Sequence, residues 1–151
     1  MDPMIFQGIT LAVALVGAVL GVMNTWRNLN QDRLRLIVKP TQAYFDNGSH
    51  RLSIDVINLS TFPVTLTHYG FFMRGTNRHI QFIPEFARGE TLPIRLEPRT
   101  SVTAFLRHGA AEVDGFAFVR SAYVLTACGN TVEATSNALD AFVMNKTRAR
   151  L

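Results

Sequence analysis

One stretch of the chain constrains its fold more than any other: residues Met4 to Met23 contain no charged side chain. At a rise of ~1.5 Å per residue, a helix over these 20 positions is ~30 Å long, which matches the hydrocarbon core of a bilayer. The stretch also lacks the polar face that a helix on the surface of a soluble domain carries. It therefore predicts a transmembrane anchor within residues 1–25.

A cleaved secretory signal is the main alternative to an anchor, and the flanks argue against it. Such a signal has a basic start, an apolar core of ~7–15 residues and a small-x-small cleavage site. This chain begins Met1-Asp2-Pro3, its apolar core is longer, and residues 21–26 offer no such site. The stretch is therefore interpreted as an anchor that stays on the protein.

The residues after the apolar stretch predict the orientation of the anchor. The expected membrane-interface residues are Trp26, Arg27, Arg33, Arg35 and Lys39, against one acid, Asp32. Lys and Arg remain on the cytoplasmic side during insertion. We therefore expect a single-pass protein of the cytoplasmic membrane, with its N-terminus outside and its C-terminal domain in the cytoplasm.

Small residues recur every four positions within the apolar stretch, at Ala14, Gly17, Ala18 and Gly21. Such residues let two helices approach closely, because association in lipid depends on packing. They predict a helix-packing face. The alternative is that they are ordinary residues of a single span.

The pattern changes to period two after a short juxtamembrane linker at residues 26–32. For example, Leu52, Ile54 and Val56 alternate with polar residues. Strands are expected at 33–39, 51–57, 63–73, 78–83, 93–97, 101–106, 116–127 and 131–135, with turns at 46–49 and 74–77. Short strands at this spacing predict a mainly β domain, an antiparallel sandwich over residues 33–135.

The last segment, 136–151, predicts a short amphipathic helix. Ser136 can cap it, and Leu139, Phe142 and Val143 share one face. That face packs on the domain's own core or, alternatively, docks on the membrane surface.

Two stretches of the β region resemble bacterial immunoglobulin-like sandwiches. In residues 56–66 a strand ends at Asn58 and a crossover containing Pro63 follows, and in residues 96–102 a Leu-x-Pro turn precedes a Thr/Ser/Val strand. With its N-terminal span and the Asn-x-Trp-Arg stretch at 24–27, the chain resembles small uncharacterised bacterial or phage membrane proteins that carry such a domain. The resemblance implies an immunoglobulin-like fold and a membrane location, and no catalytic residues.

The sequence contains no pattern typical of catalysis, metal binding or cofactor binding. The four histidines (His50, His68, His79 and His108) are isolated, and no glycine-rich phosphate loop is present. Cys128 is the only cysteine, which fits a reducing compartment, and we expect it to be a core thiol at a strand end. No enzyme activity, metal or cofactor is therefore expected.

An interaction or structural role at the inner membrane face is the leading hypothesis. The expected partners are membrane lipids and another membrane or membrane-proximal protein, for which a second copy of this chain is one candidate. The candidate partner loop is 84–92, where Phe86 and Leu92 lie among charges such as Arg88, although both apolar side chains could instead tuck under the sheet.

Two other classes of function stay open. With a net charge of +4, the juxtamembrane and sheet arginines could bind anionic lipid or nucleic acid. Nucleic acid is the less expected ligand, because no recognisable binding module is present. The third class is an enzyme whose site the sequence does not reveal.

Overall fold

The computed structural model describes residues 3–31, 33–46, 50–107 and 116–148. The chain forms two compact units, Met1–Arg33 and Leu34–Leu151. The first unit is one helix, α1 (Pro3–Gln31), and its segment Gln7–Arg27 is long and apolar enough to cross a membrane. The predicted apolar helix is confirmed. It runs on through most of the expected linker, because no proline or glycine interrupts residues 24–31.

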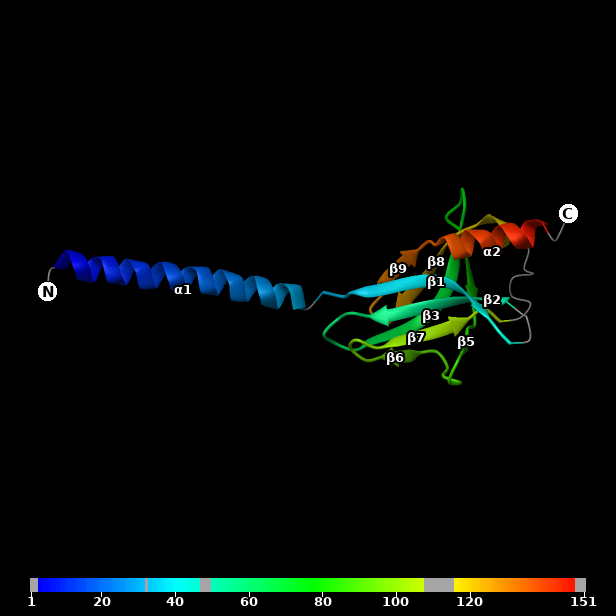
Figure 1. Ribbon diagram of the computed structural model, residues 1–151, viewed down its shortest axis with the longest axis horizontal. Helices are drawn as coiled ribbons and strands as arrows, with labels where there is room; N and C mark the ends of the chain where they lie inside the picture. Colours follow the sequence, from blue (N-terminus) through cyan, green and yellow to red (C-terminus); the bar gives the residue numbers. More distant parts are fainter. Residues whose placement is uncertain (1–2, 32, 47–49, 108–115, 149–151) are drawn as a thin grey trace. The chain divides into compact units, whose positions relative to one another are not determined.

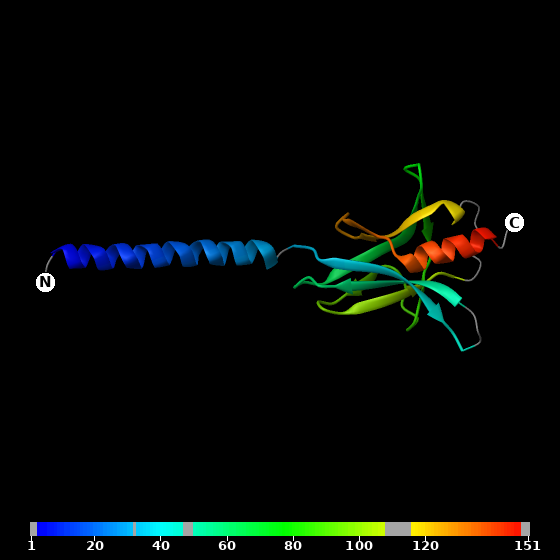
Figure 2. The same cartoon turned by 45° about the horizontal axis from the view of Figure 1, so that its top comes forward.

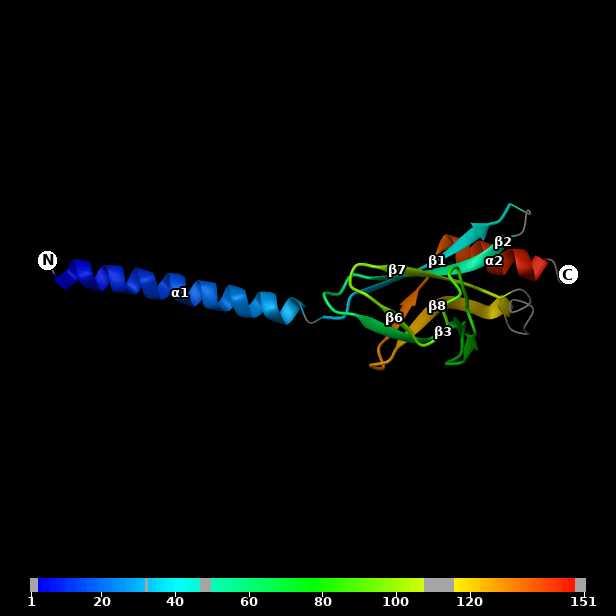
Figure 3. The same ribbon diagram turned by 90° about the horizontal axis from the view of Figure 1, so that it is seen from below.

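The second unit contains two antiparallel sheets (Figure 1). Sheet A has the order β1 (Leu36–Tyr44), β2 (His50–Asn58), β7 (Ser101–Phe105), β5 (Glu85–Phe86). Sheet B has the order β4 (His79–Phe82), β3 (Val64–Met73), β8 (Val119–Thr126), β9 (Thr131–Ala134), and β6 (Ile94–Leu96) pairs with the start of β3. Figure 3 shows β1, β2 and β7 in one layer and β3 and β8 in the other.

Alternate residues of both sheets form one apolar core. The predicted inner face of β2 is confirmed, since Leu52, Ile54 and Val56 are at most 1% exposed. From sheet B, the Tyr69 ring packs edge-on against Phe86 of sheet A, with ring centroids 5.9 Å apart. The expected antiparallel sheets are therefore present and are held together by interleaved side chains.

The structure departs from the expected strands in three places. The first strand continues past Lys39 to Tyr44, and residues 116–118 form a 3-10 helix, η2 (Phe116–Phe118), before β8 begins. The two-residue strand β5 was not expected at all. The 74–77 turn is present, with Gly75 at a φ of 69°, whereas most of the expected 46–49 turn lies outside the described residues.

Asn58 forms hydrogen bonds with two loops at one end of the β domain, the end at which its first strand, β1, begins. Its buried side-chain amide donates hydrogen bonds to the carbonyl oxygens of Phe62 (2.9 Å) and Leu96 (3.0 Å), and its Oδ1 accepts one from the Ser60 N–H (2.9 Å). We call this the proximal end. It comprises the loops 59–63 and 97–100 and the turn 127–130, where the Ala127 N–H donates to the Thr65 carbonyl (2.8 Å).

The C-terminal helix α2 (Asn137–Arg148) packs on the domain itself. Ser136 caps it as predicted, because its Oγ accepts the Leu139 N–H (3.1 Å) and also donates to the Pro40 carbonyl of β1 (2.7 Å). Leu139 and Val143 are buried in the core. Figure 2 shows α2 alongside β1, so α2 covers the outer edge of sheet A. Pro40 is tolerated on this outermost strand, because its nitrogen faces away from β2 and no hydrogen bond of the sheet depends on it.

Candidate functional site

A groove lies beside the free edge of β7. On one side, β7 pairs with β2 along Ser101–Phe105. On the other side, β5 pairs only with Ala104 and Phe105. No strand among the described residues pairs with that side of residues 101–103.

A turn explains why β5 is so short. Phe86 is buried against Tyr69 and fixes the end of the strand in the core. Three residues later, Gly89 has a φ of 74° and its N–H donates to the Phe86 carbonyl (3.1 Å). The left-handed conformation, which glycine adopts at little cost, turns the chain away from β7. The outer edge of β7 is therefore left unpaired at residues 101–103.

The groove at this edge has a volume of about 430 Å³. Its walls come from residues 87–90, β6 and residues 97–103. Both signs of charge line it: Arg95 Nε lies 3.0 Å from Glu97 Oε1, and the Arg88 backbone N–H donates to Glu90 Oε2 (3.2 Å). A groove with a strand edge on one wall and paired charges on the other suits an extended peptide backbone.

The predicted partner loop contributes to this groove in a different way from that expected. Phe86 is only 8% exposed, and Leu92 is half-buried against the core. Neither side chain is part of an exposed apolar patch, because Phe86 belongs to β5 and lies in the core, and Leu92 packs against that core. Arg88 is exposed and lines the groove, as a partner-contacting residue would.

Most arginines of the sheets are paired with carboxylates. The pairs are Arg51–Glu85 (2.8 Å), Arg107–Glu85 (3.3 Å), Arg74–Asp140 (3.1 Å), Arg95–Glu97 (3.0 Å) and Arg120–Glu133 (2.8 Å). Each pair neutralises charge that a polyanion would otherwise meet. These contacts weigh against a continuous nucleic-acid groove on the described surface.

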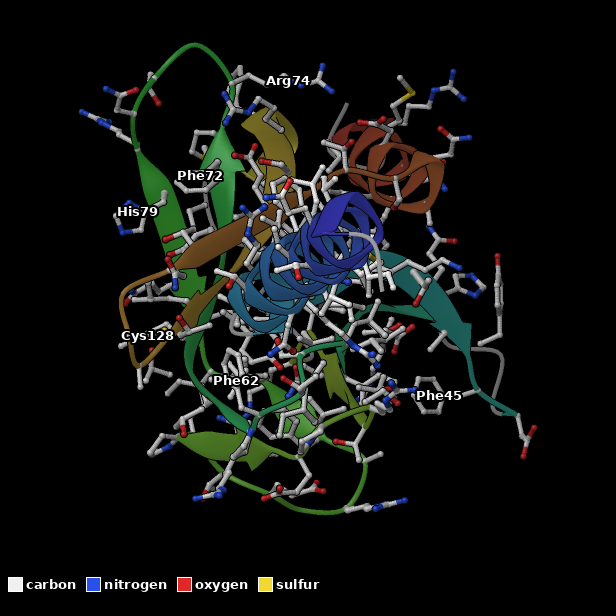
Figure 4. The ribbon with its side chains drawn as sticks, turned by 90° about the vertical axis from the view of Figure 1, so that its left-hand side faces the viewer. Phe45, Phe62, Phe72, Arg74, His79 and Cys128 are labelled. Carbon is white, nitrogen blue, oxygen red and sulfur yellow. The ribbon has the colours of Figure 1, made fainter. Side chains whose placement is uncertain are left out.

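The outer face of sheet B carries an aromatic cluster that the sequence did not reveal. Tyr123 lies over Gly70, its partner on β3, and its ring centroid is 4.5 Å from that of Phe72 and 5.8 Å from that of His79. Figure 4 shows Phe72 and His79 side by side on β3 and β4. Burial raises the pKa of the Tyr123 hydroxyl. A glycine inside a strand often marks such a close approach. In the sequence, Gly70 is the residue that could have indicated this cluster.

Cys128 is exposed in the β8–β9 turn, so the expectation of a core thiol is wrong. The β8 strand ends at Thr126, which places the cysteine beyond the core. The Thr126 hydroxyl lies 3.1 Å from Sγ and the Asn130 amide donates to Sγ at 3.3 Å. The hydrogen bond with Thr126, joined by those from Asn130, lowers the pKa of the Cys128 thiol.

The predicted residues of the anchor and its flank are exposed where the structure describes them. Ala14, Gly17, Ala18 and Gly21 lie along α1, and a Cβ added at either glycine meets no atom within 4 Å. The interface residues Trp26, Arg27, Arg33, Arg35 and Lys39 are also exposed. The last two belong to the β domain, and Lys39 lies within β1.

The histidines are dispersed in the structure as they are in the sequence. His50, His68 and His79 lie on β2, β3 and β4, and His108 is outside the described residues. Within the described ranges, no group of three or more His, Cys, Asp or Glu residues is placed to hold a metal ion.

The sequence matches no family model, and no curated protein aligns with it significantly.

Proposed function

We propose that this chain is a non-catalytic, single-span protein of the cytoplasmic membrane that presents its β domain to another protein at the inner face. The apolar length of Gln7–Arg27 supports the span. Arg33, Arg35 and Lys39 follow this segment, which itself ends at Arg27, against one acid, Asp32, and this excess of basic residues supports a cytoplasmic domain.

The proposed domain type is an immunoglobulin-like sandwich, and the strand order supports it. Immunoglobulin-like domains place strands A, B, E and D in one sheet and C, F and G in the other, with C′ added beside C in larger members. Taken in chain order, β1-β2-β7-β5 corresponds to A-B-E-D, and β4-β3-β8-β9 corresponds to C′-C-F-G. The additional strand β6 lies between D and E in the chain and pairs with the start of C.

The partner contact is the groove, where an extended segment of the partner protein adds a strand to β7. The observation that carries this proposal is the open side of residues 101–103, where β5 ends. The Asn58 N–H donates to the Thr100 carbonyl, and the Leu106 N–H donates to the Leu52 carbonyl. Backbone groups alternate in direction along an antiparallel strand, so the N–H groups of Ser101 and Thr103 face away from β2 and toward the groove.

A proline at Ser101 tests this contact. The change removes an N–H that the β2 ladder does not use, and proline is tolerated at the first residue of an edge strand. In cells, a photo-crosslinking amino acid at Arg88 should give an adduct of defined mass, and Ser101→Pro should remove most of it.

Thr131→Pro is the matched control for Ser101→Pro. Thr131 is the first residue of the edge strand β9, and the Thr126 N–H donates to the Asn130 carbonyl, so the Thr131 N–H faces away from β8. The Thr131→Pro chain should form the Arg88 adduct at its normal level. A crosslinker at Arg74 gives the background level of adduct. Strand addition at β7 would be contradicted if the Arg88 adduct survived Ser101→Pro, or if the crosslinker at Arg88 gave no adduct above that background.

A further inference from the structure

We propose that the proximal end of the β domain binds the headgroup region of an anionic lipid surface, through Arg35, Arg99 and Leu59. This inference rests on the membrane anchoring proposed above and concerns a different surface from the groove. Gln31 ends α1 and Leu34 begins the β unit. In an anchored protein, this end is therefore tethered close to the bilayer by a few residues of at most ~3.6 Å each.

Hydrogen bonds hold the three residues on one framework. The Arg35 N–H donates to Ser60 Oγ (2.8 Å), and the Leu59 N–H donates to the Arg35 carbonyl (2.7 Å). The Arg99 N–H donates to the Asn58 carbonyl (2.7 Å). Because Asn58 also binds both loops through its side chain, the two arginines and the leucine belong to one ordered surface.

The chemistry of this surface fits lipid headgroups. Arg35 and Arg99 are exposed, and neither forms an ion pair within the described ranges, whereas the nearby Glu97 is neutralised by Arg95. Leu59 is 47% exposed on the same surface. Guanidinium groups bind phosphate, and a protruding aliphatic side chain enters the boundary between headgroups and acyl chains.

Arg99 has a backbone conformation that is uncommon for arginine. Its φ is 59°, in the left-handed region that favours glycine or asparagine. An arginine here presents a long cation beside Asn58, where a smaller residue would satisfy the backbone better. The backbone of Arg35 is bonded to Leu59 and that of Arg99 to the neighbouring Asn58, so both arginines belong to the same end as Leu59.

The sole cysteine provides the test, because Cys128 is exposed in the 127–130 turn of the same end. Phe62 and Cys128, both labelled in Figure 4, mark two of the proximal loops. The full chain is labelled at Cys128 with an environment-sensitive fluorophore and reconstituted into vesicles. Its emission should shift to shorter wavelength in phosphatidylcholine–phosphatidylglycerol vesicles relative to phosphatidylcholine alone.

Four variants make the measurement specific to this surface. Arg99→Gln should weaken the lipid-docked state about fivefold, the value for one basic residue at an anionic surface, and Leu59→Ser should reduce the shift as well. Arg78→Gln removes one exposed charge from the opposite end of β3 and should leave the shift unchanged. A fluorophore moved to that opposite end, in Cys128→Ser/Asn77→Cys, should report water in both vesicle types.

The outcomes separate this inference from the proposed anchor. If alkaline carbonate extracts the chain from the vesicles, the anchor fails. If the chain stays in the bilayer but Cys128 gives the same emission in neutral and anionic vesicles, lipid binding by the proximal end is overturned. A shift produced by an oligonucleotide and not by anionic vesicles overturns it too.

Discussion

At the scale of single residues, Gly70 shows how the absence of a side chain fixes an aromatic neighbour. A Cβ at this position would lie 2.5 Å from the Ile80 carbonyl oxygen and 2.5 Å from the Tyr123 ring. The backbone oxygen cannot move without breaking the β3–β4 pairing. Gly70→Ala should therefore lower the free energy of unfolding by about 1–3 kcal/mol.

Urea unfolding of the full chain in detergent, followed by circular dichroism, measures this change. Thr65→Ala on the same strand is the control, and its effect should stay within about 0.5 kcal/mol. Equal stability of Gly70→Ala and the parent chain would show that the Tyr123 ring does not depend on this glycine.

Glu133 couples stability to pH. Its carboxylate accepts a hydrogen bond from the Ser121 hydroxyl and lies 2.8 Å from Arg120, and these contacts, that with Ser121 first, lower its pKa. A lowered pKa in the folded state stabilises the protein at pH values above the pKa in the unfolded chain. This contribution is lost as the pH falls through the folded-state pKa.

Glu133→Gln should therefore lower the melting temperature at pH 7, and the difference from the parent should shrink toward zero in acid. Thermal unfolding across this pH range measures the effect, and Ser121→Ala should remove part of the same pH dependence. A melting difference that does not change with pH would contradict this account.

At the scale of elements, the predictable parts are those whose pattern is local. The charge-free stretch defines α1, and the alternation of Leu52, Ile54 and Val56 defines the buried face of β2. In contrast, β5 is two residues long and exists only because it pairs with β7, far along the chain. The groove depends on where that pairing stops, so no local pattern could reveal it.

The helix α1 makes its own prediction. If Gly17 and Gly21 form a packing face, Gly17→Ile and Gly21→Ile should abolish self-association of the span, because a β-branched side chain holds two backbones apart. Insertion should be unchanged, since isoleucine is more apolar than glycine. The Thr25 hydroxyl donates a hydrogen bond to the Gly21 carbonyl of its own helix (2.9 Å), so the prediction relies on packing at the glycines and not on a hydrogen bond from Thr25 to a second helix.

Resonance energy transfer between labelled spans in vesicles measures this association, with Leu15→Ile as the conservative control. If the glycine variants associate as well as the parent span, or if the parent span does not associate, the glycines are ordinary residues of the anchor. An oligomer would then have to form through the β domain.

At the scale of the whole molecule, Cys128 reports on which side of the membrane the domain lies. It is the only cysteine and is exposed, and its lowered pKa increases the thiolate fraction that reacts with maleimide. In intact bacterial spheroplasts, a membrane-impermeant maleimide should leave it unlabelled, and permeabilisation should allow labelling. Cys128→Ser/Asp2→Cys should give the opposite pattern. Labelling of Cys128 in intact spheroplasts would place the domain outside.

The two borders of sheet A also determine what kind of assembly the domain can enter. At β1, Pro40 lacks an N–H and its carbonyl is occupied by the Ser136 hydroxyl, whereas residues 101–103 of β7 are open. A sheet with two open borders can recruit strands on both sides and polymerise into fibres. If a partner strand adds to β7 as proposed, the groups of Pro40 disfavour a second strand at β1. A complex built in this way would be finite, and many anchored copies would not join into a filament through this sheet.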